Sequence, residues 1–303
     1  MARISAGDIR ALARAATLVE SQSAAGRELI ASMFAQTGHA MIIGVTGAPG
    51  AGKSTIVDHF ASVLRAQGKT VGIIAVDPSS AYSHGALLGD RIRMQRHHDD
   101  PGVFIRSMAT RGKLGGVAQA TLDIALLLDA AGRNVVIIET VGVGQDEIEI
   151  ARLADITVVV LVPGMGDDVQ AIKAGIMEVA DVFAINKSDL PGADRLEQEI
   201  RAMQSIADEV GRANAAPVRR VVATEGQGID ELLSVISSLF QRQGRQSRRA
   251  EVWEFRLREM LREDLLAAIP QDTLHTHSVL VAEKKEDPYS AVNALKEALW
   301  PAK

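Results

Sequence analysis

One stretch of the chain has the residue types and the spacing of a phosphate-binding loop, G-x-x-x-x-G-K-[ST]. It comprises Gly47, Ala48, Pro49, Gly50, Ala51, Gly52, Lys53 and Ser54, followed by Thr55. Glycines let backbone N–H groups surround a phosphate, and the N-terminus of a following helix favours negative charge. Lys53 is expected to contact the β- and γ-phosphates, and the Ser54 hydroxyl to bind Mg²⁺. The sequence therefore predicts a site for a nucleoside triphosphate.

A second motif, N-K-x-D, predicts which base is bound. It comprises Asn186, Lys187, Ser188 and Asp189, directly after the apolar run 182–185. The Asp189 carboxylate can accept hydrogen bonds from the ring N–H and the exocyclic amine of guanine, whereas adenine offers neither donor there. Because an unpaired buried polar group is costly, such a carboxylate selects guanine. We expect Lys187 to lie along the base, Asn186 to tie the motif to the phosphate loop, and the Ala223 N–H to contact the guanine carbonyl oxygen.

Three carboxylates are candidates for a magnesium site. Asp77 and Glu139 each close an apolar stretch of the chain, and Asp90 lies between them in a glycine-containing segment. The carboxyl ends of parallel strands meet at the edge of the sheet where ligands bind, and carboxylate and hydroxyl oxygens are ligands of Mg²⁺. As single residues, Asp77 and Asp90 are also compatible with helix caps.

The loop after Glu139 is rich in glycine and contains Gln145. Such a loop can rearrange when the γ-phosphate is bound or released. Gln145 is a candidate for positioning the attacking water, although it is equally compatible with a simple loop residue. The candidate catalytic residues are thus Lys53, Glu139 and Gln145.

These residues must be positioned by alternating strands and helices, a pattern typical of an α/β fold with a mostly parallel sheet covered on both faces. Strands are expected at 41–46, 71–76, 103–106, 134–139, 156–162, 181–186 and 218–223. Helices are expected at 53–67, 85–98, 115–131, 168–179, 193–212 and 228–242. The first forty residues favour two helices, the second over 26–36.

The chain divides into three predicted parts: an N-terminal helical extension (1–40), a nucleotide-binding domain (41–243) and a C-terminal helical arm (244–303). In the arm, apolar residues recur at helical spacing: Trp253, Leu257, Met260, Leu261 and Leu265. This stripe must be buried on the core or on another subunit.

Composition excludes several classes of function. The 303 residues have a net charge of −5, which disfavours binding to nucleic acid or to an anionic membrane. There is no cysteine, and we see neither a signal peptide nor a membrane-spanning apolar run. These features favour a soluble, cytoplasmic protein.

Taken together, the motifs resemble those of the MeaB/ArgK/MMAA group of P-loop GTPases. Six segments carry the resemblance, in this order: GVTGAPGAGKST, AVDPSS with LLGDRIRM, RSMATRGKLGG, ETVGVGQDE, PGMGDDVQAIKAGI and NKSD. The resemblance extends from about residue 20 to the C-terminus. It implies a Mg²⁺-dependent GTPase of the metallochaperone class, which escorts a cobalamin-dependent acyl-CoA mutase, namely methylmalonyl-CoA mutase or a close relative.

The resemblance also implies residue roles. Ser54, Asp77, Asp90 and Glu139 would gather around Mg²⁺, and residues 164–173 would form a switch contacting the mutase, with Asp167, Asp168, Gln170 and Lys173 as its polar members. The C-terminal stripe would be a homodimerisation arm. The GTP cycle would gate adenosylcobalamin loading and the protection or reactivation of the mutase. The N-terminal extension is short for the group, which leaves open the contacts that longer members make there.

Two other functions remain compatible with the sequence: nickel insertion by a related GTPase, and phosphorylation of a transport protein. A nickel site at His97-His98 is not expected, because adjacent side chains point to different sides of a helix. Arg106, Arg111 and Lys113 are equally compatible with a nucleotide contact, a partner contact or a solvated loop.

Overall fold

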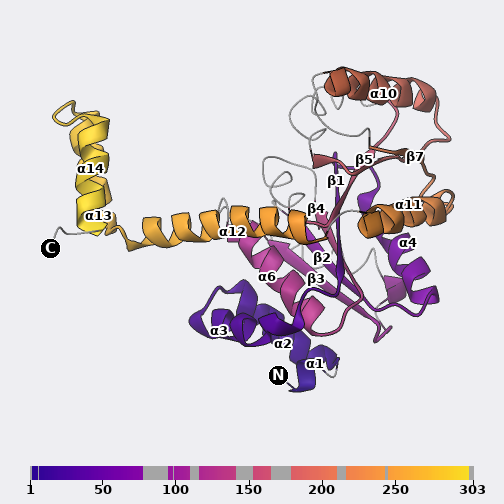
Figure 1. Ribbon diagram of the computed structural model, residues 1–303, viewed down its shortest axis with the longest axis horizontal. Coiled ribbons are helices and arrows are strands. Elements are labelled where there is room, and N and C mark those ends of the chain that lie inside the picture. The colour runs from indigo at the N-terminus through magenta and orange to yellow at the C-terminus, as the bar shows by residue number, and fades with distance from the viewer. Residues whose placement is uncertain are drawn as a thin grey trace. The chain divides into compact units, whose positions relative to one another are not determined.

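The structure is a computed structural model. It describes residues 2–5, 7–77, 95–97, 99–109, 116–140, 153–164, 179–209, 216–242 and 245–299. Within these residues, seven parallel strands form one sheet in the order β3-β2-β4-β1-β5-β6-β7 (Figure 1). The strands are β1 (Met41–Gly47), β2 (Val71–Asp77), β3 (Val103–Ala109), β4 (Val135–Thr140), β5 (Ile156–Leu161), β6 (Val182–Ile185) and β7 (Val218–Arg220). The predicted α/β fold with a parallel sheet is confirmed.

The central strand, β1, lies between β4 and β5. Strands β4 and β5 are buried along their whole length, as expected for continuous Val/Ile/Leu runs covered on both faces. The register places Val45 of β1 opposite Glu139 of β4. Because the strands are parallel, their C-terminal residues lie at one edge of the sheet. This is the edge where open parallel sheets bind ligands.

Helices α4 (Lys53–Ala66) and α11 (Ile229–Arg242) cover one face of the sheet. Their buried side chains, such as Phe60 and Ile236, share a core with Val158 and Val160 of β5. The alternate residue Val159 belongs to a second core beneath α10 (Ala193–Glu209). This alternation is the period of two of a strand buried on both faces.

Helix α6 (Gly116–Ala130) packs on the other face, against β2 and β4. Gly72 of β2 makes this approach possible, because a Cβ there would lie 2.7 Å from Leu128 Cδ1. Of the N-terminal elements, α2, α3 and η1 contact α6, and α1 contacts α2 (Figure 1). They are α1 (Ala2–Ser5), α2 (Ile9–Glu20), α3 (Ala24–Met33) and the 3₁₀ turn η1 (Phe34–Gln36).

An ion pair joins the N-terminal helices to the sheet. The Arg106 guanidinium on β3 donates to the Glu20 carboxylate on α2, with Nε 3.1 Å from Oε2. This internal ion pair on a strand was not among the alternatives that the sequence suggested for Arg106. The second N-terminal helix begins at Ala24, before the predicted Gly26, because the Ser23 hydroxyl accepts from the Gly26 N–H and caps it.

Two other predicted boundaries differ from the structure. The last strand ends at Arg220 and not at the predicted residue 223, because Val222 pairs instead with Gln227 in an isolated antiparallel bridge that turns the chain. Residues 95–97 form a 3₁₀ turn, η3 (Gln95–His97), where an α-helix over 85–98 was expected. The other residues of that expected helix lie outside the described residues. The same holds for the helix expected at 168–179, of which only residue 179 is described.

The chain divides into two compact units, residues 1–249 and residues 250–303. Helix α12 (Arg245–Ala268) leads into the second unit, which also contains α13 (Gln271–Ala282) and α14 (Pro288–Leu299). Within it, Arg256 lies over the Trp253 ring at 4.9 Å from the centroid, and His277 Nδ1 is 2.7 Å from Glu286 Oε2. Leu257 and Leu261 of the predicted stripe are each 60% exposed in the single chain.

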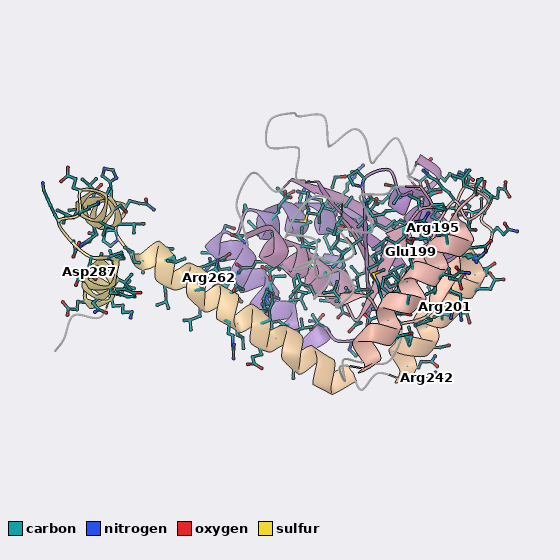
Figure 2. The ribbon with its side chains drawn as sticks, turned by 90° about the horizontal axis from the view of Figure 1, so that it is seen from above. Arg195, Glu199, Arg201, Arg242, Arg262 and Asp287 are labelled. Atoms are coloured by element: carbon teal, nitrogen blue, oxygen red, sulfur yellow. The ribbon has the colours of Figure 1, made fainter. Side chains whose placement is uncertain are left out.

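Charged side chains of α10 pair along its solvent-facing side, where Arg195 and Glu199 project together (Figure 2). Their Nε–Oε1 distance is 2.8 Å at an i,i+4 spacing. Exposed pairs of this kind contribute roughly 0–1 kcal/mol each to stability. None of the described helices has the length and apolar character needed to cross a membrane.

Candidate functional site

The phosphate loop joins the end of β1 to the start of α4, and its backbone requires glycine at two positions. Gly47 has φ +139°, and a Cβ there would lie 2.1 Å from the Val160 carbonyl oxygen. Gly52 has φ +90°, and a Cβ there would lie 2.2 Å from Asn186 Nδ2. Both positions combine a left-handed backbone with the close approach of a neighbouring segment.

Lys53 begins α4, and its ammonium is held at the loop. Its Nζ donates to the carbonyl oxygens of Gly47 at 2.6 Å and Ala48 at 2.9 Å, and the residue is 5% exposed. The ammonium is thus positioned by the loop that the motif assigns to phosphate binding. A phosphate oxygen would be a stronger partner than these neutral carbonyl groups, because it carries a negative charge opposite the ammonium.

Ser54 and Glu139 meet beside the loop. The Ser54 hydroxyl donates to Glu139 Oε1 at 2.5 Å, and Glu139 is 5% exposed. Strand pairing brings Asp77 to the same edge, because Ala75 of β2 lies opposite Glu139 of β4. A hydroxyl and a carboxylate that already converge are a donor set suited to Mg²⁺, so these residues fit the predicted metal.

Asn186 connects the base motif to the phosphate loop. Its Nδ2 donates to the Ala51 carbonyl oxygen at 2.8 Å, and its Oδ1 accepts from the Ala223 N–H at 3.0 Å. Asn186 is only 3% exposed, so both bonds are shielded from water. The expected tie between the two motifs is present, and Ala223 is joined to it.

The neighbouring residues of the motif complete a turn at this edge. Lys187 has φ +55°, and its Nζ donates to the Gly50 carbonyl oxygen at 3.1 Å. The Ser188 hydroxyl donates to the Val221 carbonyl oxygen at 3.1 Å, while Asp189 is exposed and accessible to a base. The Ala223 N–H would have to share its bond to Asn186 in order to contact guanine, so that contact stays a prediction.

The structure also brings together residues that the motif analysis did not select. The Thr140 hydroxyl at the end of β4 donates to the Thr46 hydroxyl on β1 at 3.0 Å, and both residues are buried. These threonines directly flank Glu139 and Gly47, which is the signal that could have identified them. Their bond joins the entry of the phosphate loop to the entry of the segment that contains Gln145.

A buried pair, His97 and Asp58, joins η3 to α4. His97 Nε2 lies 3.2 Å from Asp58 Oδ1 and 3.2 Å from the Asp58 carbonyl oxygen. His97 follows the segment that contains Asp90. Its contact with Asp58 therefore holds this part of the chain against α4, the helix that begins with Lys53. Its ring faces Asp58 and the Ser62 hydroxyl, at 3.4 Å.

Some predicted site residues lie outside the described part of the chain. They are Asp90, Gln145, Asp167, Asp168, Gln170 and Lys173. The described residues nevertheless assemble the phosphate loop, the carboxylate and hydroxyl of the predicted metal site, and the base motif at one sheet edge. That arrangement can bind a guanine nucleotide and hold its terminal phosphate for transfer to water.

Sequence comparison identifies relatives of the chain. The profile of the family described as "Methylmalonyl Co-A mutase-associated GTPase MeaB" matches residues 12–273. A Pyrococcus abyssi protein named as a GTPase is 46% identical, with 98% of this chain and 95% of the relative covered. The mouse "Methylmalonic aciduria type A homolog, mitochondrial" is 37% identical, with 75% of this chain and 59% of the relative covered.

Two solved structures share the fold. One described as "LAO/AO transport system kinase" superposes with a TM-score of 0.73 at 31% identity, with 98% of this chain and 95% of that chain covered. HypB from Helicobacter pylori, in complex with nickel, superposes with a TM-score of 0.51 at 16% identity, with 71% and 93% covered. At that identity the HypB similarity supports the fold alone.

Proposed function

Because the chain belongs to the methylmalonyl-CoA mutase-associated GTPase family, we propose that it is a chaperone of a cobalamin-dependent acyl-CoA mutase. It is a GTPase, and its GTP cycle would gate adenosylcobalamin loading and the protection or reactivation of the mutase. The observation that carries the nucleotide part of the proposal is the Asn186 bridge, which joins the base motif to the phosphate loop. The match of the family model to residues 12–273 supports the partner. Methylmalonyl-CoA mutase, named in the family description, is the first partner to test.

Each residue of the site has a distinct task in this proposal. Asp189 selects guanine, the backbone of residues 47–52 surrounds the phosphates, and Lys53 stabilises the charge that develops on the β- and γ-phosphates. Ser54 and Glu139, with Asp77 and Asp90, would hold Mg²⁺. The bound ion supplies charge neutralisation at the phosphate oxygens.

The attacking water would be positioned by the loop after β4. Gln145 is proposed to orient the attacking water, with Glu139 fixing the start of its loop. The Thr46–Thr140 hydrogen bond would transmit the position of the phosphate loop to that segment. We expect slow hydrolysis by the isolated protein, because the candidate catalytic residues Lys53, Glu139 and Gln145 include no obvious strong group to activate the attacking water.

The partner role is tested by measuring GTP hydrolysis with and without purified methylmalonyl-CoA mutase. Lys173→Ala should leave the intrinsic rate nearly unchanged and reduce the stimulation by mutase. Couplings between sites are commonly about 1–3 kcal/mol, so a loss of roughly 5- to 150-fold in coupling is the scale expected. Equal stimulation of parent and variant would contradict the assignment of residues 164–173 as a switch. If the mutase neither stimulated hydrolysis nor co-purified with the protein, the partner assignment would be wrong.

A homodimer is part of the proposal. The exposed Leu257 and Leu261 on α12 support it, because a second copy of the arm could cover them. Leu257→Glu combined with Leu261→Glu should convert a dimer to a monomer in sedimentation analysis. A parent protein that is already monomeric at micromolar concentration would contradict this part.

The nickel-chaperone and kinase alternatives give different results in two assays. Nickel insertion requires stoichiometric nickel binding in equilibrium dialysis, whereas the proposed function requires only Mg²⁺. A kinase must transfer the γ-phosphate to protein, whereas a GTPase releases it as inorganic phosphate. Radiolabelled γ-phosphate recovered on a protein would favour the kinase.

A further inference from the structure

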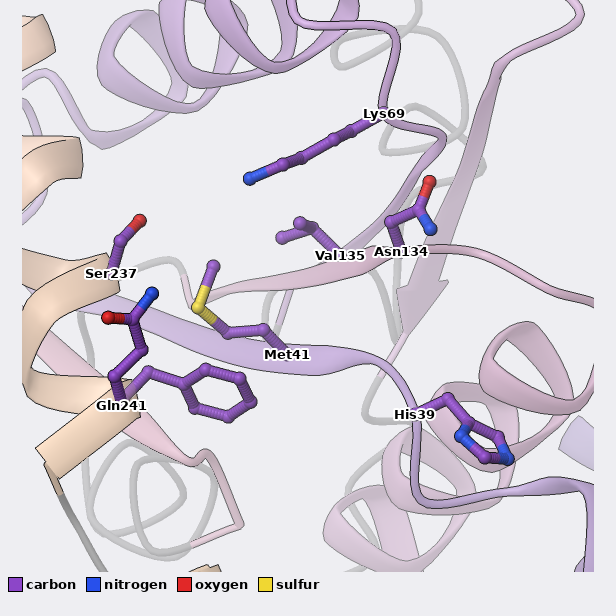
Figure 3. Close-up of a pocket in the computed structure, with 8 residues that line it drawn as sticks. His39, Met41, Lys69, Asn134, Val135, Ser237 and Gln241 are labelled. Atoms are coloured by element: carbon purple, nitrogen blue, oxygen red, sulfur yellow. The ribbon is translucent and has the colours of Figure 1, made fainter.

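A cavity of about 190 Å³ lies at the edge of the sheet opposite the nucleotide site (Figure 3). Its floor includes Met41 at the start of β1 and Val135 at the start of β4, which are 6% and 2% exposed. Phe240 of α11 adds an aromatic wall. β1 and β4 run away from this cavity toward the phosphate loop and Glu139, so the two sites occupy opposite ends of the same strands.

Polar side chains ring the apolar floor. Lys69, from the turn before β2, extends across the cavity toward Ser237, and the Gln241 amide lies beside Met41 (Figure 3). Among the hydrogen bonds and ion pairs of the described residues, none involves the side chain of Lys69, Ser237 or Gln241. Lys69 therefore contributes a positive charge to the cavity that no described group neutralises.

The carboxylates of Asp129 and Asp100 already have other partners. Asp129 accepts hydrogen bonds from the N–H groups of residues 38–40, the shortest at 2.5 Å from Gly38. Asp100 is paired with Arg65 at 2.8 Å. None of the described residues that line the cavity carries a carboxylate. The cavity thus combines an apolar floor with an unneutralised cation and neutral hydrogen-bonding groups.

We propose that this cavity binds a small organic carboxylate with a compact apolar body. The body would rest on Met41, Val135 and Phe240, and the carboxylate would accept hydrogen bonds from the Lys69 ammonium and the Ser237 hydroxyl. The size fits: a cavity of about 150 Å³ is enough to hold benzene, so about 190 Å³ accommodates a benzoate-sized molecule. An inorganic anion would leave the apolar floor unused.

Benzoate is a suitable probe, and benzyl alcohol is its neutral control of similar shape. Binding to the full chain is measured by calorimetry and by NMR of ¹³C-methyl-labelled methionine, with the Met41 signal assigned from Met41→Leu. We expect benzoate to shift the Met41 signal and to bind at least about tenfold more tightly than benzyl alcohol, as a charge-assisted hydrogen bond predicts. Equal binding of the two probes, or shifts only at other methionines, would overturn the proposal.

Two variants test the same site independently. Lys69→Met keeps the aliphatic stem and removes the charge, so it should lose about tenfold or more in benzoate affinity. Ser237→Phe should fill the cavity and abolish the Met41 shift while Lys69 is retained. Lys296→Met, on α14, is the matched control and should bind benzoate like the parent. Parent-like binding by either Lys69→Met or Ser237→Phe, each checked for folding by thermal melting, would show that the cavity is not a carboxylate site.

Discussion

The side-chain amide of Asn186 donates a 2.8 Å hydrogen bond to the carbonyl oxygen of Ala51, which is 135 residues away in the sequence. The same side chain accepts from the Ala223 N–H. One buried residue therefore couples the base motif, the phosphate loop and the segment after β7. Any change that displaces it should disturb base recognition and phosphate binding together.

Gly52→Ala tests this coupling. The added Cβ would lie 2.2 Å from Asn186 Nδ2 at φ +90°, so the amide must leave Ala51. We expect a large loss of GTP affinity, measured with a fluorescent GTP analogue. Gly68→Ala is the control, since Gly68 has φ +76° and nothing within 4 Å of the added Cβ. It should lower the free energy of unfolding by about 1–2 kcal/mol and leave GTP affinity unchanged. Parent-like affinity of Gly52→Ala would mean that the bridge is not required.

Base selection should depend on Asp189. Asp189→Asn replaces two acceptor atoms by one acceptor and one donor, which suits xanthine better than guanine. Each lost charge-assisted hydrogen bond costs roughly 1.5–3 kcal/mol, so GTP binding should weaken by several kcal/mol and XTP binding should improve. Competition binding with both nucleotides measures this. Asp230→Asn, an exposed aspartate on α11 outside the motifs, is the control and should bind GTP normally.

Lys53 and the metal-site acids should differ in their response to magnesium. Lys53→Ala should abolish hydrolysis at any magnesium concentration, because the lost charge stabilises the transferring phosphoryl group. Glu139→Ala and Asp77→Ala should lose activity at low Mg²⁺ and recover part of it at high Mg²⁺. Hydrolysis rates over a magnesium titration distinguish these cases, and full activity of an acid variant at low Mg²⁺ would exclude that residue from the site.

The Asp100–Arg65 pair should make stability depend on pH. The Arg65 guanidinium, followed by the Gly102 N–H, holds the pKa of Asp100 below its ordinary value. A lowered carboxyl pKa contributes stability above the unfolded pKa of about 3.9, and this contribution is lost as pH falls through the folded pKa. Asp100→Asn should therefore cost about 1 kcal/mol near pH 7 and little at the lowest pH at which the parent still folds.

A second variant separates the ion pair from the loss of the carboxylate itself. In Gly102→Ala the new Cβ would lie 2.1 Å from Arg65 Cζ and displace the guanidinium. Its unfolding free energy, measured by urea titration across pH, should converge with that of the parent in acid, as for Asp100→Asn. A constant difference at every pH would contradict the ion-pair explanation.

Local sequence was sufficient for the strands and for both motifs. The apolar runs within the strands predicted at 134–139 and 156–162 favour burial between two layers of helices, so their burial follows from the sequence. The glycines and Lys53 predict a phosphate-binding loop, because few other local structures require these residue types at that spacing. The last strand was predicted too long, because the pairing of Val222 with Gln227 depends on a turn chemistry that apolar runs do not reveal.

By itself, then, the sequence determined the parallel α/β fold, the phosphate loop and the base motif, since each is encoded by neighbouring residues. Only the tertiary structure decided that Asn186 bonds Ala51 and Ala223, that Ser54 meets Glu139, that Thr46 meets Thr140 and that Arg106 pairs with Glu20. It also decided that Lys69 and Ser237 share a cavity with Met41. These partners are separated by tens of residues or more, and their meeting depends on strand order and register, which a single sequence does not state locally.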